Sequence, residues 1–323
     1  MFTLEELREA RLIVAEAMPP TPQYRWPLLD EATGCQLWVK HENHTPTGAF
    51  KVRGGLVHMR RRREAGQTGG IITATRGNHG QSIGFAALRE GITATIVAPH
   101  GNSVEKNSAM RALGVELIEA GADFDEARGV ADQLAEERGL DYVPSFHPDL
   151  VVGVATYAYE LLTAVPDLEV VYVPIGLGSG ICSVIGVRDL LGLATEVVGV
   201  VAERAPAYAQ SFAVGHVVPG DTAATFADGV AVRVPDPVAL AMIVGGARRI
   251  VTVTEDAIAD AARLLYTATH NVAEGAGAAA LAGIMSERHD LAGQRVGVIL
   301  SGGNIDAGQF ALVLTGTTPT VGG

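Results

Sequence analysis

At 323 residues the chain has room for one or two domains, and its 48% apolar and 19% charged residues are typical of a globular protein with a large core. The formal net charge of −12 argues against a nucleic-acid partner, and the apolar runs are shorter than the roughly 18 residues that a membrane helix needs. Two cysteines, Cys35 and Cys182, make no disulfide framework and no signal-peptide pattern precedes them, so we expect a cytoplasmic protein.

Along the chain, β-branched apolar runs alternate with segments of helical length. We expect buried strands at residues 71–75, 93–98, 115–120, 170–175, 197–202 and 295–300. Helices are expected among them at residues 80–90, 104–113, 125–138 and 256–269. Continuous apolar strands that alternate with helices predict an α/β fold whose parallel sheet is covered on both faces.

Three of these strands run directly into glycine-rich segments, which read ITATRGNHG, VYVPIGLGSG and VGVILSGGN. In open α/β sheets, ligands bind beyond the carboxyl ends of the strands, where such loops gather. We therefore expect these three distant segments to meet in one ligand site.

Lys51 follows a Thr-Gly-Ala-Phe turn and precedes a helical pattern. A lysine that forms a Schiff base must lose its proton easily, which requires desolvation or a nearby positive potential. The start of a helix supplies that potential, and Phe50 supplies an apolar wall. A Phe-Lys pair at a helix start is also common on protein surfaces, so the pair alone does not identify a reactive amine.

Five motifs in a fixed order give Lys51 a more specific interpretation. TGAFKVRGG, TRGNHGQSIGFAA, PIGLGSG, EGAGAAALA and SGGN follow one another between about residues 35 and 306. Together they closely resemble the serine/threonine dehydratase family, a tryptophan-synthase-like group of pyridoxal-phosphate enzymes of fold type II that also includes serine racemase.

This resemblance implies an α/β, two-domain architecture like the tryptophan-synthase β subunit, with twisted, mostly parallel sheets covered by helices. Residues 1–69 and 148–323 are expected to form a discontinuous large domain that binds pyridoxal 5′-phosphate. Residues 70–147 are expected to form a small mobile domain that carries the Asn78 loop. A homodimer is a further expectation from the family. Biosynthetic threonine dehydratases carry a regulatory domain after the last motif, and we expect none here, where residues 307–323 follow.

The resemblance also assigns roles to single residues. Lys51 matches the family lysine that binds the cofactor covalently and removes the substrate α-proton, and Phe50 matches an aromatic residue beside the cofactor ring. Asn78 matches the asparagine that hydrogen-bonds the 3′-oxygen of the cofactor. The substrate carboxylate is expected at the loop that these residues form: Thr75, Arg76, Gly77, Asn78 and His79. The cofactor phosphate is expected in a cradle of four residues: Gly176, Gly178, Ser179 and Gly180.

Two further matches bear on the chemistry. Ser301 matches the residue that faces the pyridine nitrogen, and a hydroxyl keeps that nitrogen less protonated than a carboxylate would. The weaker electron sink favours fast loss of a leaving group, and we expect dehydration and deamination of L-threonine or L-serine to a 2-oxo acid and ammonia. Glu274 matches an acidic residue near the cofactor, although an ordinary carboxylate at a helix start has the same pattern.

Arg76 departs from the family pattern, in which Ser or Ala precedes the Gly-Asn-His triplet. Serine racemases use a serine there as acid and base, whereas a guanidinium does not exchange protons near neutral pH. Racemisation is therefore only an alternative. If Arg76 grips a second carboxylate, 3-hydroxyaspartate becomes the preferred substrate, and the alternative is an arginine turned towards solvent or a structural carboxylate. Phenylserine is a further alternative substrate.

A divalent cation site of some family members needs a glutamate and an aspartate. Glu203 is a weak candidate for the glutamate, but Ala209 stands about where the aspartate would fall, so we expect no metal. Asp228 in FADGV is either a turn residue or a ligand.

Two other classes of protein are considered. In a dinucleotide-dependent oxidoreductase, VYVPIGLGSG would bind NAD and Glu203 the ribose, but Ile181 occupies the place of the last glycine in that fingerprint. A catalytically silent amino-acid sensor is opposed by the intact set of cofactor residues.

Overall fold

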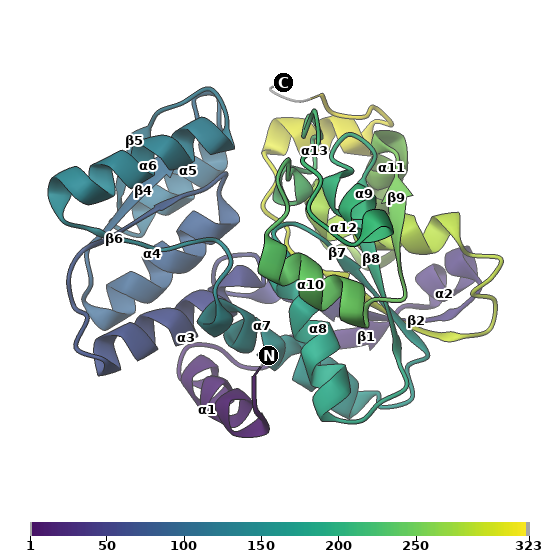
Figure 1. Ribbon diagram of the computed structural model, residues 1–323. Coiled ribbons are helices and arrows are strands. Elements are labelled where there is room, and N and C mark those ends of the chain that lie inside the picture. The colour runs from purple at the N-terminus through teal and green to yellow at the C-terminus, as the bar shows by residue number, and fades with distance from the viewer. Residues whose placement is uncertain (1, 321–323) are drawn as a thin grey trace.

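The computed structural model describes residues 2–320, in which two open sheets stand side by side (Figure 1). The larger sheet has the strand order β1-β2-β10-β7-β8-β9 and the smaller has the order β5-β4-β3-β6. The strands of the larger sheet are β1 (Gln23–Arg25), β2 (Gln36–His41), β10 (Arg295–Leu300), β7 (Val170–Pro174), β8 (Glu196–Ala202) and β9 (Arg249–Val253). Those of the smaller are β5 (Glu116–Glu119), β4 (Ala94–Ala98), β3 (Ile71–Ala74) and β6 (Asp141–Tyr142). Only the β1–β2 pair is antiparallel.

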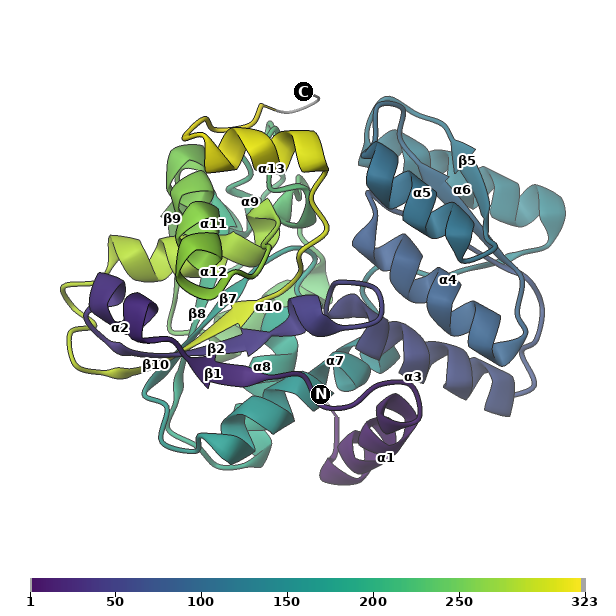
Figure 2. The same ribbon diagram turned by 180° about the vertical axis from the view of Figure 1, so that it is seen from behind.

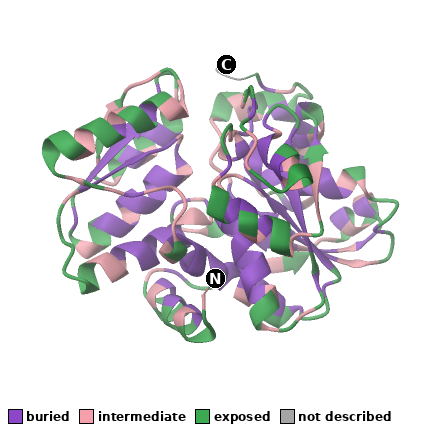
Figure 3. Ribbon diagram, viewed as in Figure 1, coloured by how far each residue is buried: buried purple, intermediate pink, exposed green. Residues whose placement is uncertain are grey.

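The central strands are buried along their whole length, which explains their continuous apolar sequences. Every residue of β3, β4 and β7 is buried, and Figure 3 shows the strands of both sheets enclosed between partly exposed helices. A parallel sheet needs this cover because its crossover helices lie on both faces. The expected α/β fold with mostly parallel sheets is confirmed.

Most helices alternate with the strands, whereas α9 and α10, and α11 and α12, follow one another with no strand between them. Their bounds are α1 (Leu4–Ala15), α2 (Pro27–Thr33), α3 (Lys51–Glu64), α4 (Asn78–Glu90), α5 (Val104–Ala112), α6 (Phe124–Arg138), α7 (Pro148–Ala164), α8 (Ser179–Leu190), α9 (Ala207–Val214), α10 (Pro237–Gly246), α11 (Glu255–Thr269), α12 (Gly275–Ser286) and α13 (Ala307–Leu314). Two 3₁₀ turns, η1 (Glu42–His44) and η2 (Asp228–Val230), complete the elements. Across residues 2–320, no helix combines the length and the apolar character that crossing a membrane requires.

Helices α3 and α7, which lie beneath the two sheets in both views (Figures 1 and 2), approach each other backbone to backbone at Gly54 and Gly153. A Cβ atom on Gly54 would lie 2.8 Å from the carbonyl oxygen of Leu150, and one on Gly153 would lie 2.5 Å from that of Arg53. Real Cβ atoms do not approach so closely, so each glycine is required by the other helix's backbone. Because Lys51 is the first residue of α3, this contact between the two helices fixes the position of Lys51.

A buried ion network holds the same end of α3. Arg53 is fully buried and donates to Glu42 at 2.8 Å and to Glu160 at 2.7 Å. Lys40 is also fully buried and donates to Glu160 at 2.6 Å. Burial alone would lower the pKa of Arg53, but Glu42 and Glu160 together raise it above its ordinary value, which keeps the guanidinium charged.

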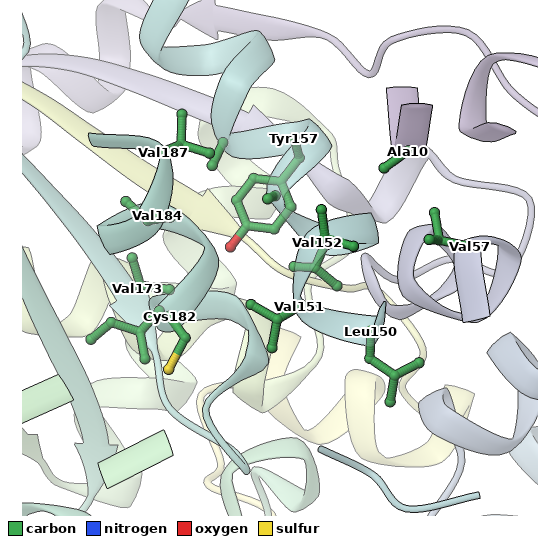
Figure 4. Close-up of a cluster of buried hydrophobic side chains, with 14 of the residues drawn as sticks. Ala10, Val57, Leu150, Val151, Val152, Tyr157, Val173, Cys182, Val184 and Val187 are labelled. Carbon is green, nitrogen blue, oxygen red and sulfur yellow. The ribbon is translucent and has the colours of Figure 1, made fainter. Parts of the chain in front are cut away.

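The largest apolar core cluster includes residues of α1, α3, α4, α7 and α8. Figure 4 shows Tyr157 of α7 among Val152, Val184 and Val187, with Cys182 and Val173 nearby. Tyr157 is buried, and its hydroxyl donates to the Gly180 carbonyl at 3.1 Å. The core therefore reaches the first turn of α8 through a polar contact, as a buried tyrosine requires.

Candidate active site

The predicted glycine-rich segments meet at two adjoining spaces between the sheets. All nine expected cofactor residues line the narrower space: Phe50, Lys51, Asn78, Gly176, Gly178, Ser179, Gly180, Glu274 and Ser301. The wider space is a cleft of about 630 Å³, and residues 75–79 of the expected substrate loop all line it. Lys51, Asn78, Leu177 and Gly229 belong to both walls, so the two spaces meet there.

Lys51 stands at this meeting point, at the first position of α3. Burial lowers its pKa from 10.5 to about 8, and the carboxylate of Glu274 offsets only part of that effect. Its Nζ lies 5.0 Å from the centroid of the Phe50 ring, an apolar surface that offers little solvation. The amine is therefore easier to deprotonate than an ordinary lysine.

The start of α8 has the features of a phosphate cradle. Gly178 caps this helix in the left-handed region, at φ 102°, and no side chain accepts from the first-turn N–H groups. A Cβ on Gly176 would lie 2.4 Å from the carbonyl oxygen of Gly229, so only glycine fits there. Free N–H groups at a helix start bind anions, and this donor set fits the phosphate of pyridoxal phosphate.

Phe50 connects the cradle to the end of β10. Its backbone N–H donates to the carbonyl oxygen of Ser301 at 3.0 Å, and its ring meets that of Tyr157 edge-on with centroids 6.1 Å apart. Because Tyr157 also binds Gly180, one chain of contacts runs from Ser301 through Phe50 to the cradle. An aromatic wall, a phosphate cradle and an amine thus surround the narrow space, as an aromatic aldehyde cofactor would require.

Asn78 is held by two partners at the start of α4. Its amide donates to Glu274 Oε1 at 2.6 Å, and its carbonyl oxygen accepts from Asn304 Nδ2 at 2.8 Å. Asn304 also donates to the Thr47 carbonyl at 2.8 Å. The Asn78 side chain, which follows β3 of the smaller sheet, is therefore oriented by two residues from the larger-sheet part of the chain, while its expected contact with the cofactor 3′-oxygen stays a proposal.

Lys106 of α5 is a site residue that sequence reasoning missed. Its Nζ lies 2.6 Å from Asp228 Oδ2 and 3.1 Å from Glu274 Oε2, and all three line the two spaces. Burial alone would lower the pKa of Lys106, but Asp228 and Glu274 together raise it above its ordinary value. Burial raises the pKa of Glu274, and Lys106 opposes that shift. Asp228, left open as turn or ligand, lies in the η2 turn and pairs with this lysine.

The loop of residues 75–79 uses part of its hydrogen-bonding capacity internally. The Thr75 hydroxyl oxygen accepts from the N–H groups of Gly77 at 2.9 Å and Gly80 at 3.2 Å. No side chain caps α4, so the N–H groups of Asn78 and His79 face the cleft without a cap. A substrate carboxylate has two donors available at this helix start.

Two side chains of this loop, Arg76 and His79, have hydrogen-bonding atoms without a protein partner among the described residues. Within residues 2–320, the half-buried Arg76 guanidinium has neither a hydrogen bond nor an ion pair, although it lines the cleft. His79 is buried, and its Nε2 lacks a partner among the same residues. Burial and then the charge of Lys51 lower the pKa of His79 to about 3, so the imidazole is neutral.

The weak metal candidate Glu203 is exposed after β8, and its backbone N–H donates to the Val253 carbonyl at 2.8 Å. It belongs to no group of three close ligand-type side chains in the part of the chain described.

The sequence matches the family described as "Pyridoxal-phosphate dependent enzyme" over residues 14–302. It is 33% identical to an L-threonine ammonia-lyase of Thermotoga maritima, over 97% of this chain and 78% of that protein. A biosynthetic L-threonine dehydratase of Salmonella typhimurium is 34% identical over 92% of this chain, which spans 58% of that protein's length. An L-threo-3-hydroxyaspartate ammonia-lyase of Saccharomyces cerevisiae is 30% identical over 97% of both chains.

Comparison with solved structures leads to the same group of enzymes. The structure of a processed threonine deaminase isoform from Solanum lycopersicum superposes with a TM-score of 0.87 and 30% identity, covering 98% of this chain and 94% of that one. The predicted cofactor is thereby confirmed, and the dinucleotide-dependent alternative is set aside.

Proposed function

Since the chain belongs to the pyridoxal-phosphate-dependent enzyme family, in which its relatives are ammonia-lyases, we propose that it dehydrates and deaminates L-threonine or L-serine. The products are a 2-oxo acid and ammonia. The observation that carries this proposal is Lys51, an amine of lowered pKa placed between an anion cradle and a substrate cleft. When bound, pyridoxal phosphate supplies the electron withdrawal that acidifies the substrate α-carbon.

Lys51 is the proposed base. At about pH 7.5, an amine with a pKa of about 8 is roughly one quarter neutral, against about one part in a thousand at the ordinary 10.5. The neutral Nζ accepts the proton from the substrate α-carbon. The N–H groups of Asn78 and His79 hold the substrate carboxylate, which orients the α-proton towards Lys51.

Exclusion of water is the proposed role of residues 70–147. Besides the bonds of Asn78 and Lys106, three further contacts join this segment to the C-terminal part of the chain. Arg233 lies 2.6 Å from Asp125, the Ala307 N–H donates to Glu105 at 2.8 Å, and Ser103 bonds to Asp306. We propose that these contacts form on closure, which keeps water from the reacting carbon.

Arg76 favours a second candidate substrate, 3-hydroxyaspartate. A cleft-lining guanidinium without a protein partner is suited to a bidentate contact with a second carboxylate. The similarity to a yeast ammonia-lyase named for this substrate supports the same candidate. With the α-carboxylate at the N–H groups of Asn78 and His79, threonine and serine have no second carboxylate for this cation.

A substrate panel tests both candidates. Purified protein is assayed for release of 2-oxo acid from L-threonine, L-serine, both diastereomers of 3-hydroxyaspartate, and phenylserine, and separately for racemisation of serine. We expect a visible absorbance band that borohydride abolishes with label on Lys51, and turnover of at least one hydroxy amino acid. A colourless protein, or one that only racemises, contradicts the proposal.

We further propose a cytoplasmic homodimer. Cys35 and Cys182 are both buried and unpaired, as free thiols in a reducing compartment are. Analytical ultracentrifugation of the holoenzyme tests the dimer, and a species of about 34 kDa would contradict it.

A further inference from the structure

Two histidines and an aspartate gather at the α3–α7 contact, outside the walls of the two spaces, although His147 directly follows the cleft-lining Phe146. His58 lies on α3, His147 is the N-cap of α7, and Asp149 lies in the first turn of α7. None of them lines the cleft or the narrow space. Nothing in the proposed reaction uses them.

The three side chains are spaced as metal ligands. Asp149 Oδ2 lies 3.2 Å from His58 Nδ1 and 3.4 Å from His147 Nδ1, and one ligand atom of each residue lies within 4.8 Å of the others. A tetrahedral zinc ion with bonds of about 2.0–2.1 Å has ligand atoms roughly 3.3 Å apart. Two of the three ligand separations thus already match a tetrahedral site.

Hydrogen bonding among the three groups leaves a conflict. The Asp149 backbone N–H donates to His147 Nδ1 at 3.2 Å, so this nitrogen carries a lone pair rather than a proton. The same nitrogen faces the Asp149 carboxylate at 3.4 Å, which places two acceptors side by side. A cation bound to this lone pair would replace the 3.2 Å contact with the Asp149 N–H and turn the nearby carboxylate into a second ligand.

The surroundings suit a cation in spite of one nearby positive charge. Arg61 donates to the other carboxylate oxygen, Oδ1, at 2.7 Å, which orients Asp149 and leaves Oδ2 facing the histidines. The His147 side chain is 37% exposed, so an ion can enter from solvent.

We propose that His58, His147 and Asp149 bind a zinc-like transition-metal ion, with water as the fourth ligand. Two imidazoles and one carboxylate favour such an ion over magnesium or calcium, which take oxygen ligands. The ion would tie α3, which begins with Lys51, to the start of α7, where the chain leaves β6 and the smaller sheet. The ion would have a structural role and take no part in the reaction.

Metal binding to the tag-free holoenzyme tests this site. After chelator treatment, the protein is dialysed against Zn²⁺ and its metal content is measured, and Co²⁺ is added separately to record tetrahedral absorption bands. We expect one Zn²⁺ per chain and a higher Tm with Zn²⁺ than without. A wild-type protein that keeps only trace zinc would overturn the proposal.

Matched variants locate the ion. His147→Asn keeps an acceptor for the α7 N-cap but removes the imidazole, and His58→Gln removes the second ring. We expect at least about 100-fold weaker Zn²⁺ binding in both, and no change in the control His289→Asn, whose histidine is exposed. Equal binding by His147→Asn and wild type would overturn the assignment. These readouts do not depend on the substrate or on turnover.

Discussion

The two sides of the cleft each present a lysine, the half-buried Lys51 and the buried Lys106, and their surroundings favour opposite charge states. Lys51 has an apolar ring beside it and a pKa lowered to about 8. Lys106 has two carboxylates within 3.1 Å and a pKa raised above its ordinary value. Burial disfavours the charge of both, so the neighbours decide the outcome.

This difference separates a reacting amine from a structural cation within one site. Glu274 connects the two, because it pairs with Lys106 through Oε2 and also acts on Lys51 through space. Lys106 therefore reduces the negative charge that would otherwise keep Lys51 protonated. Lys51 is therefore easier to deprotonate partly because Lys106 stays charged and pairs with Glu274.

Removal of the reacting amine has the largest expected effect. Lys51→Ala loses the base and the covalent anchor, and we expect turnover to fall by about 10⁴-fold. Steady-state assays and the visible absorbance band measure the loss. If Lys106→Ala instead abolished the borohydride-trapped label while Lys51→Ala kept it, the roles of the two lysines would be reversed.

Removal of the structural cation comes next. Lys106→Met keeps the aliphatic stem but leaves Asp228 and Glu274 without a counter-charge, and we expect a loss of roughly 3 kcal/mol in the free energy of unfolding. Urea denaturation measures it. The double variant Lys106→Met/Asp228→Asn should recover part of this loss, because one uncompensated carboxylate is gone. No recovery would mean that packing against Gly77, rather than charge, explains Lys106.

The link between the lysines has a pH signature. Attachment of the cofactor to the apo protein requires neutral Lys51, so its rate should rise with pH through a midpoint near 8. In Glu274→Gln the negative charge that favours the ammonium form is removed, so the midpoint should move to lower pH. Borohydride trapping at a series of pH values measures both. An upward shift would contradict the assigned influence of Glu274.

Substitution of Arg76, another cation that lines the cleft, has the smallest expected effect and acts only on specificity. For Arg76→Gln we expect kcat/KM for 3-hydroxyaspartate to fall about 10- to 100-fold, while threonine changes little. Assays of 2-oxo acid release from both substrates in both proteins measure the ratio. Equal changes for the two substrates would exclude a contact with the second carboxylate.

The sequence predicted the frame of the molecule well, because buried parallel strands have continuous apolar runs. All six expected strands are present, and the run at 295–300 matches β10 residue for residue. Four strands, β1, β2, β6 and β9, were not among those expected, and β1 and β6 have only three and two residues, which leave no periodic signal. The motifs likewise gathered the expected cofactor residues around the narrow space.

The ionic partners inside the site were not predictable in the same way. Lys106 lies in a segment that reads as an ordinary helix, and its partners are 122 and 168 residues away. Asn304 was noted only as part of a motif, and its bond to Asn78 spans 226 residues. Neither pairing leaves a local pattern in one sequence, because both arise only when the two sheets come together.

The glycine crossing of α3 and α7 has a consequence for how this enzyme can change over time. Gly54 and Gly153 contact each other's backbone directly, so neither position tolerates even a methyl group. The cleft loops can diversify around new substrates, whereas the base of the helix that presents Lys51 cannot be adjusted by small steps. Substitutions that change the substrate should therefore accumulate at cleft residues such as Arg76, while the position of the Lys51 amine stays unchanged.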